Sequence, residues 1–388
     1  MHMLLPVALL ALAAGTMPLA ADEGAGGDEP SVTTRSPAAP PRGAPFLEPR
    51  GARAEPFALL GDSIAPGSSR QLSWAASELF DGLPDDTPVL VVHGAKPGPA
   101  LCLTAAIHGD ELNGIEIVRR VLHALEPDRL AGTVIGVPIV NIQAFRRSSR
   151  YLPDRRDLNR YFPGSPDGSA ASRIAHSLFH DIILHCDALV DLHTGSFERT
   201  NLPQLRADLH HAGVAALANG FGATVIVNSQ PQTGTLRQAA TLAGVPAVTL
   251  EAGGPEQVEA HQVKHGVRGI EALLHTLGMT ADSRAWDERE ATYLNSSWVR
   301  ADHGGILMSS VELGSTVREG QLLGRVTDPI SNDSAGIYAP SDGRVIGMAR
   351  NQVVMPGFAA YHLGSASRGR TGPLGPQLSP DEIKDKAE

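Results

Sequence analysis

The hydrophobic pattern of this chain alternates between short apolar runs and amphipathic segments. Six largely apolar runs are strand-like: 88–92, 100–107, 134–140, 188–192, 223–227 and 247–250. The run 100–107 is short, continuous and bounded by turn residues, which is typical of a buried strand. Five segments between and after these runs have helical spacing: 111–125, 170–185, 208–220, 235–243 and 256–277. Apolar strands that alternate with helices predict an α/β domain, in which helices cover both faces of a mostly parallel mixed sheet.

Short strand-like runs with frequent glycine follow residue 278. The segments 317–324 and 337–347 are typical of strand-turn-strand units, and they resemble the two halves of a biotinyl/lipoyl-type barrel sandwich. No lysine lies at the turn between them, so we do not expect a covalently attached swinging cofactor. We therefore predict a small C-terminal all-β barrel-sandwich domain.

The N-terminal segment has the pattern of a secretory signal. An apolar stretch runs from Leu4 to Gly15, too short to span a bilayer, and small residues follow it, although the start lacks lysine and arginine. We expect a periplasmic or secreted protein. The expected parts are a signal peptide at 1–21, a disordered linker at 22–55, a catalytic domain at 56–285, the β-rich domain at 286–366 and a disordered tail at 367–388.

Charge and cysteine content narrow the possible partners. A net charge of -10 and a pI near 5.8 argue against nucleic acid, and against a membrane once the signal is removed. The only cysteines are Cys102 and Cys186, both in expected buried strands. Buried free thiols are the expected state, although an exported protein could join them. The oligomeric state stays open.

Polar residues stand where three expected strands end. His108 follows one strand, His193 a second and Glu251 a third. Glu111 comes three residues after His108, at a strand-to-helix corner. One such residue alone is often only a solvated polar group. In open α/β sheets, however, ligands sit beyond the carboxyl ends of the strands, and two His and one Glu are a common zinc donor set in hydrolases. We therefore predict a metal site, with Asp191 able to orient a ligand from behind.

Two loops flank these positions. The segment 150–164 is rich in arginine and is bounded by proline and glycine, which suits bidentate binding of a carboxylate. The alternative is a solvated basic loop. The segment 195–203 has a loop-like composition and could cover the site, but its polar residues carry no separate signature.

An ordered set of motifs resembles a known family of zinc hydrolases. His108-x-x-Glu111, Arg150, Asp157-Leu158-Asn159-Arg160, Asp191-Leu192-His193 and Leu250-Glu251 occur in the order seen in the succinylglutamate desuccinylase/aspartoacylase family. That family belongs to the zinc carboxypeptidase-like clan, and the likeness extends over roughly residues 56–366. Within the family, the chain is most similar to the bacterial "predicted deacylase" branch.

The resemblance implies a role for each matching residue. It implies that His108, Glu111 and His193 bind one Zn²⁺ per chain. Glu251 would be the general base and acid toward the attacking water, and Arg150 would stabilise the oxyanion. Asn159 and Arg160 would bind a substrate carboxylate, and Arg237 is a weaker candidate for a second carboxylate contact. The C-terminal domain would wall the entrance to the site and restrict it to small acylated substrates.

The pattern departs from aspartoacylase proper in two places. The spacing between Arg150 and Asn159 is about two residues longer, and Met355 stands where aspartoacylases carry a tyrosine. Both departures put aspartate-type specificity in doubt. The function we expect is hydrolysis of the amide bond of a small N-acylated amino acid or related amide.

Three other functions compete with a deacylase. A metallocarboxypeptidase acting on short or cell-wall peptides is the first, and a non-catalytic ligand-binding module is the second. The third is a serine esterase of the SGNH type, because Gly61-Asp62-Ser63 occurs near the N-terminus. Its only candidate Asp-x-x-His partner, Asp208 to His211, falls in an expected helix, and no G-x-S-x-G elbow is present.

Overall fold

A computed structural model of the chain describes residues 47, 54–76, 86–281, 286, 290–350 and 352–365, all within one unit, Ala39–Glu388. The expected signal peptide, the expected C-terminal tail and most of the expected linker lie outside the described residues. In the described part of the chain, no helix is long and apolar enough to cross a membrane.

The helices and strands of the catalytic part agree with the apolar pattern. Its helices are α1 (Asn113–Ala124), α2 (Ile142–Phe145), α3 (Ala170–Asp181), α4 (Ala212–Asn219), α5 (Leu236–Leu242) and α6 (Ala260–Thr276). Its strands are β1 (Phe57–Leu59), β2 (Asp62–Ile64), β3 (Ser68–Ala75), β4 (Asp86–His93), β5 (Lys96–Ala105), β6 (Ala131–Val137), β7 (Ala188–His193), β8 (Arg199–Ala207), β9 (Val225–Asn228) and β10 (Ala247–Gly253). The six expected strands correspond to β4, β5, β6, β7, β9 and β10.

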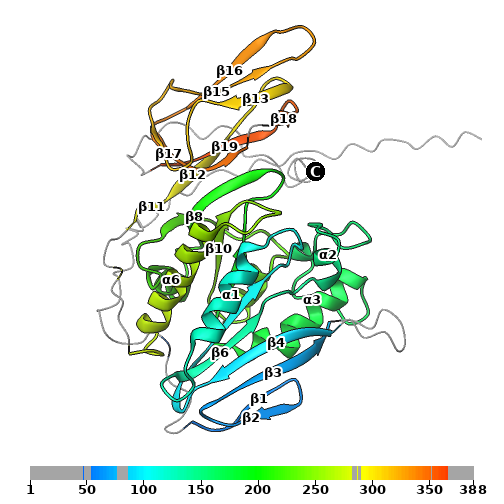
Figure 1. Cartoon of the computed structure of the whole chain (residues 1–388), viewed down its shortest axis with the longest axis vertical. Helices are drawn as coiled ribbons and strands as arrows, with labels where there is room; N and C mark the ends of the chain where they lie inside the picture. The colour runs from blue at the N-terminus through cyan, green and yellow to red at the C-terminus, as the bar shows by residue number, and fades with distance from the viewer. Residues whose placement is uncertain are drawn as a thin grey trace, which may run out of the picture. The chain divides into compact units, whose positions relative to one another are not determined.

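A large mixed sheet forms the centre of the catalytic part (Figure 1). Its strand order is β8-β10-β7-β5-β6-β4-β3. The four central strands, β10, β7, β5 and β6, are parallel to one another. On one side β8 pairs antiparallel with β10, and on the other β4 pairs antiparallel with β6 and β3 antiparallel with β4. The predicted α/β fold is confirmed. Of the strand pairs in this order, only those among the central four are parallel, and β9 adds a further parallel pair with β8. Parallel neighbours have their carboxyl ends at one edge, which is where a ligand site is expected.

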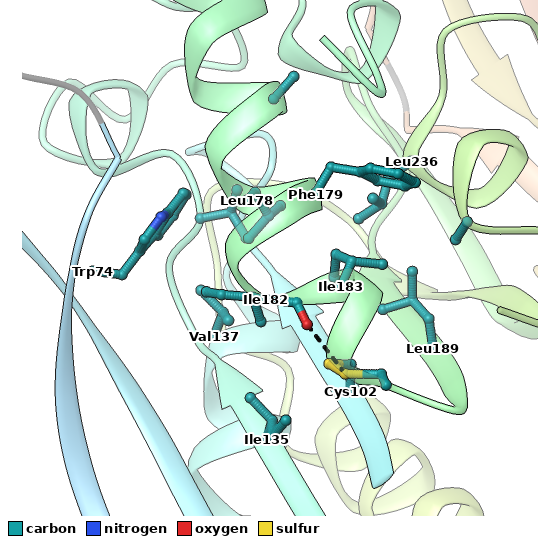
Figure 2. Close-up of a cluster of buried hydrophobic side chains, with 14 of the residues drawn as sticks. Trp74, Cys102, Ile135, Val137, Leu178, Phe179, Ile182, Ile183, Leu189 and Leu236 are labelled. Carbon is teal, nitrogen blue, oxygen red and sulfur yellow. Dashed lines mark hydrogen bonds between the residues drawn. A yellow bond between two sulfur atoms is a disulfide. The ribbon is translucent and has the colours of Figure 1, made fainter. Parts of the chain in front are cut away.

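Each face of the sheet is covered by its own helices and its own apolar core. Alternate residues of one strand enter different cores, because successive strand side chains point to opposite faces. In β6, for example, Val134 packs with α1, α4 and α6, whereas Ile135 packs with α3 and α5. Figure 2 shows the second of these cores, which includes Ile135 and Val137 of β6 and Leu178 and Phe179 of α3. The two cores hold the strand ends, and therefore the site, on a rigid scaffold.

Cys102 of β5 and Cys186, two residues before β7, form a disulfide within the same core. Their Cα atoms are 5.9 Å apart, within the usual range for such a bond. Our expectation of buried free thiols was therefore wrong. The partners are 84 residues apart in the sequence, and only the pairing of β5 with β7 brings them together.

The segment expected to be a loop over the site is largely a strand. β8 begins at Arg199 and pairs antiparallel with β10. Its polar residues interrupt the apolar alternation that usually marks a strand. This strand is important for the site, because it lies directly beside Glu251 in β10.

The C-terminal part contains strands and no helix among its described residues, 290–350 and 352–365. They are β11 (Thr292–Tyr293), β12 (Asn295–Arg300), β13 (Gly305–Ser309), β14 (Thr316–Val317), β15 (Leu322–Thr327), β16 (Ser334–Tyr338), β17 (Gly343–Ala349), β18 (Val353–Val354) and β19 (Ala359–Ser365). Four of them form a separate sheet, in the order β16-β15-β13-β18. β17, β19 and β12 instead continue the main sheet, because β17 pairs antiparallel with β8 (Figure 1).

Candidate metal centre and active site

Three side chains from two strand ends converge on one point. His108 follows β5, His193 is the last residue of β7, and Glu111 lies in the turn between His108 and α1. One ligand atom from each lies within 4.8 Å of the other two, and all three residues are at most 5% exposed. Gly109 allows this turn to pack against α2, since a Cβ at that position would lie 2.1 Å from the Ala144 carbonyl carbon. The three residues could hold one metal ion.

Each histidine ring lies between two carboxylates. The Nδ1 atoms of His108 and His193 lie 2.8 Å from Oε1 and Oε2 of Glu111, respectively. Their Nε2 atoms lie 3.1 Å from Asp157 Oδ1 and 2.8 Å from Asp191 Oδ2. A neutral imidazole has only one ring proton, so it can donate to only one of its two carboxylates. The point where both Nδ1 atoms face Glu111 therefore requires an additional positive charge, either a proton or a metal cation.

The charge state of the cluster agrees with that requirement. Burial alone would lower the pKa of His193, but the charges of Asp191 and Glu111 outweigh burial and raise it well above its usual range. Burial alone would raise the pKa of the Glu111 carboxyl, but His108 and His193 outweigh burial and hold it well below its usual range. The carboxylates around the two rings therefore favour a positive charge at this point.

The groups behind the two rings fit a metal site as well. Metal-binding histidines commonly donate their second ring N–H to a carboxylate, which fixes the tautomer and the ring orientation. Asp191 is fully buried and accepts a 2.7 Å hydrogen bond from the Thr104 hydroxyl of the neighbouring strand. Asp191 thus contacts His193 from the side away from Glu111, where we predicted a residue that orients a metal ligand. Asp157 contacts His108 in the same way.

Arg150 lies beside the metal cluster. Its Nη1 is 3.1 Å from Glu111 Oε1, and its Nη2 donates a 3.1 Å hydrogen bond to Asp157 Oδ2. Burial alone would lower the pKa of Arg150, but these two carboxylates outweigh it and raise that pKa above its usual value. A permanently charged guanidinium is thereby held within reach of anything that binds at the cluster.

Glu251 lies on β10 directly opposite His193 of β7 in the strand register. Both of its carboxylate oxygens have partners on β8: Asn201 Nδ2 donates a 2.9 Å hydrogen bond to Oε2, and Arg206 Nε lies 3.0 Å from Oε1. Neither partner was expected from the sequence: Asn201 belongs to the segment 195–203 that we had interpreted as a loop, and Arg206 lies between that segment and the expected helix at 208–220. The side chain of Glu251 is thus fixed next to the metal cluster.

The arginine-rich loop is docked onto α5. Asn159 Oδ1 accepts a 2.8 Å hydrogen bond from the Leu236 backbone N–H, and Phe162 N–H donates to the Gly234 carbonyl at 2.9 Å. This docking places Asn159 and the exposed Arg160 beside Arg237 of α5. Arg237 is 8% exposed and donates a 2.8 Å hydrogen bond to the Ser229 carbonyl.

All eight predicted site residues line one cavity of about 690 Å³: His108, Glu111, Arg150, Asn159, Arg160, His193, Arg237 and Glu251. Asn201 and Arg206 also line it, together with Arg199 of β8 and four residues of the C-terminal strands and turns. Those four are Trp298, Arg300, Phe358 and Ala359. Ser63, the residue that suggested a serine esterase, is exposed on β2 and does not line this cavity.

Comparison with known proteins agrees with this geometry. Residues 97–277 match the family model described as the succinylglutamate desuccinylase/aspartoacylase catalytic domain. The chain is 28% identical over 275 residues to N-alpha-acetyl-L-2,4-diaminobutyric acid deacetylase from Halomonas elongata, covering 68% of this chain and 78% of that protein.

Two solved structures have a similar fold. One is a succinylglutamate desuccinylase/aspartoacylase from Rhodobacter sphaeroides, with a TM-score of 0.69 and 26% identity, covering 77% of this chain and 96% of that chain. The other is the product-bound ectoine utilization protein EutE (DoeB) from Ruegeria pomeroyi, with a TM-score of 0.69 and 26% identity, covering 77% of this chain and 95% of that chain. Residues 97–277 therefore contain a catalytic domain of the succinylglutamate desuccinylase/aspartoacylase type.

Proposed function

We propose that this protein is a zinc-dependent deacylase that hydrolyses the amide bond of a small N-acylated amino acid. The observation that supports it most directly is the cavity, which combines a metal donor set, a fixed carboxylate and several arginines. Relatives named as a deacetylase and as desuccinylases agree with this class of reaction.

His108, Glu111 and His193 would hold the metal. Two nitrogens and one carboxylate oxygen form a donor set that Zn²⁺ prefers, and the aspartates behind both rings favour it further. Bound zinc would supply Lewis acidity and make hydroxide available near neutral pH.

The protein's own groups would then move the proton and stabilise charge. Glu251 takes the proton of the attacking water and gives it to the leaving amine nitrogen, for which the carboxylate must stay in one position. Arg150 stabilises the negative charge that develops on the carbonyl oxygen during attack. Both groups line the same cavity as the metal cluster, and each is held by contacts to two neighbouring side chains.

Asn159, Arg160 and Arg237 would bind the carboxylate of the amino acid; we refer to them as the carboxylate subsite. Arg237 has no carboxylate within ion-pair distance among the described residues. Burial, with the neighbouring charge of Arg206, lowers its pKa to about 10. A buried cation without a counter-ion is costly, and a substrate carboxylate would remove that cost. This residue set suits an N-acyl amino acid better than a neutral amide.

The C-terminal strands would restrict the substrate to a small one. Trp298 and Phe358 contribute aromatic rings to the cavity wall. We also propose that β12 to β19 form a barrel sandwich. A wall of this kind favours a deacylase over the alternative, a carboxypeptidase that accommodates a longer peptide.

The test is a screen for amine release with the purified, zinc-loaded protein. The substrates are N-acetyl, N-formyl and N-succinyl amino acids, with short peptides for comparison. We expect about one zinc per chain and turnover of one or more N-acyl amino acids. Cleavage of peptides alone would identify a carboxypeptidase. Full activity without metal would contradict the zinc mechanism.

Glu251→Gln separates catalysis from binding. We expect this variant to retain zinc and substrate affinity while kcat falls by about 10²- to 10⁴-fold, the contribution of a general base. A near-normal kcat would remove Glu251 from the reaction. If the wild type binds an N-acyl amino acid without turning it over, the protein is a binding module.

We further propose export from the cytoplasm. The support is the signal-like composition of residues 1–21 and the Cys102–Cys186 disulfide, because such bonds persist mainly in oxidising compartments. Fractionation of cells that produce the full-length chain tests this proposal. Recovery of uncleaved protein in the cytoplasm would refute it.

A further inference from the structure

The cavity contains more positive charge than the reaction requires. Six arginines and two carboxylates line it, and a bound metal would add two positive charges. Arg150 and Arg206 are paired with carboxylates. The other four arginines have no carboxylate within ion-pair distance among the described residues. Two of these, Arg160 and Arg237, belong to the carboxylate subsite, which leaves Arg199 and Arg300 without a role.

Arg199 is held rigidly by the C-terminal strands. Its guanidinium carbon lies 5.2 Å from the centroid of the Trp298 ring and 4.7 Å from that of Phe358. Trp298 is in turn stacked on His362, with ring centroids 4.5 Å apart. Arg199 Nε donates a 3.0 Å hydrogen bond to the Ala359 carbonyl. An arginine that stacks between aromatic rings loses little further freedom when it binds an anion.

Part of this guanidinium remains available to a ligand. An arginine has five N–H donors. Among the described residues, Arg199 donates only from Nε and, at 3.5 Å, from Nη1 to the Ser196 carbonyl. Its Nη2 donates to no described residue. Arg300 lies on the same wall and donates a 2.7 Å hydrogen bond to the Gly357 carbonyl. Burial and the neighbouring charges of Arg300 and Arg150 lower the pKa of Arg199.

We propose that Arg199 and Arg300 form a second anion subsite, which binds a carboxylate of the substrate other than the one at the carboxylate subsite. This inference rests on the proposed deacylase function and adds a substrate class to it. The preferred substrate then carries two carboxylates. The second one belongs either to the acyl group or to the amino acid side chain, and both would offer the same pair of acceptor oxygens to an arginine.

The competing explanation is that Arg199 only fastens the C-terminal strands to β8. Its ring contacts and its bond to Ala359 would serve that purpose alone. The two explanations differ in what happens to a substrate that lacks the second carboxylate. If Arg199 has only this structural role, its substitution changes kcat/KM for all substrates equally. If it determines specificity, the substitution changes kcat/KM only for substrates with the second carboxylate.

The test compares carboxylates with their carboxamide isosteres. One pair is N-succinyl-alanine and N-succinamoyl-alanine, which probes the acyl end. The other pair is N-acetyl-glutamate and N-acetyl-glutamine, which probes the side chain. We expect wild-type kcat/KM to favour the carboxylate of at least one pair by about 10-fold or more, as for a hydrogen bond to a charged group. Which pair shows the preference identifies the source of the carboxylate.

Arg199→Met keeps the length of the side chain and removes its charge. We expect the preference to fall to near unity, while kcat/KM for the carboxamide substrate stays within about threefold of wild type and Arg199→Lys retains part of the preference. Arg325→Met is the matched control, because Arg325 lies on the separate C-terminal sheet and does not line the cavity. An equal loss for both members of each pair, or no preference in the wild type, would overturn the subsite.

Calorimetry makes the result independent of turnover. Glutarate and its monoamide are titrated into zinc-loaded wild type and into Arg199→Met. We expect the wild type to bind glutarate at least about 10-fold more tightly than the monoamide, and the variant to lose that difference. Equal binding in both proteins would refute the second subsite. Binding as expected in a protein without hydrolytic activity would instead retain the subsite and refute the deacylase.

Discussion

At the scale of single residues, the position of Glu251, the proposed general base, depends on two side chains that flank it. Glu251 accepts a 2.9 Å hydrogen bond from Asn201 and lies 3.0 Å from Arg206. Asn201 itself has little alternative space, because a Cβ on Gly347 of β17 would lie 2.6 Å from its Oδ1. A group that must exchange a proton at a fixed point gains from this restraint. Asn201 is therefore a positioning residue, which acts through Glu251.

Asn201→Ala should lower kcat while KM and zinc content remain unchanged. We expect a fall of about 10- to 100-fold, short of the roughly 10²- to 10⁴-fold attributable to a general base. The matched control is Gln204→Ala, which removes a buried 3.0 Å hydrogen bond from β8 to the Ile346 carbonyl. That control should lose stability and keep its kcat. Loss of zinc from the Asn201 variant, or equal kcat in both variants, would contradict the positioning role.

Residues at strand ends could be identified from the sequence, whereas their partners could not. His108, His193 and Glu251 each follow a largely apolar run, so the pattern alone shows where they stand. Asn201 and Arg206 lie in a strand that alternates poorly, because its side chains line a polar cavity. The order of β8, β10 and β7 in the sheet is set by long-range pairing, which no local pattern encodes. The catalytic roles of these residues stay predictions.

At the scale of elements, β12 and β19 carry the aromatic stack behind Arg199. Trp298 and His362 are register partners in these antiparallel strands, and their rings lie nearly parallel, at 8°. His362 is 3% exposed, and its Nδ1 has no hydrogen-bond partner. Burial and the nearby charge of Arg206 lower the pKa of His362 to about 3, from an ordinary value of 6.5. This ring is therefore neutral in the folded protein.

The neutral state of His362 should make stability depend on pH. Above pH 6.5 the ring is neutral in both the folded and the unfolded chain, so the stability that the buried ring contributes is fully present. As the pH falls from 6.5 toward 3, only the unfolded chain takes up the proton, and stability is lost. We expect about 2 kcal/mol of this loss between pH 7 and pH 5. His362→Phe keeps a ring for the stack and should lose less stability over that range.

The measurement is urea unfolding of metal-free protein at several pH values, so that acid release of zinc does not contribute. His210→Phe is the matched control, since His210 is exposed and makes its contact with Asp208 on the surface. That control should keep the wild-type dependence on pH. An identical slope for His362→Phe and wild type would mean that His362 is not held neutral.

At the scale of the whole molecule, the C-terminal strands belong to the same sheet as the catalytic strands. The pairing of β17 with β8 joins them, so the wall of the cavity and the base candidate share one hydrogen-bonded framework. We predicted two parts from the change in apolar pattern, but a change in pattern does not show that strands continue across a boundary. Deletion of the C-terminal strands would expose the edge of β8. Point substitutions in the wall are therefore the sounder test of its function.

The disulfide should contribute stability to the whole fold. It joins β5 to the entrance of β7 and closes a long segment of chain that contains Glu111, Arg150 and the carboxylate subsite residues Asn159 and Arg160. A cross-link of this kind restricts the unfolded chain, and its loss typically costs about 2 to 5 kcal/mol. The double variant Cys102→Ala/Cys186→Ala should show that loss in urea unfolding. Its zinc content should be unchanged, because neither cysteine lines the cavity.

Reduction of the wild type separates the cross-link from the packing of the sulfur atoms. Wild-type protein with a thiol reductant should lose most of the same stability, whereas the double variant should not respond to the reductant. Titration of the thiols in denatured, unreduced protein provides the direct measurement, and we expect none to react. Two reactive thiols per chain would restore the sequence-based expectation of free cysteines. They would also remove the disulfide as an argument for export.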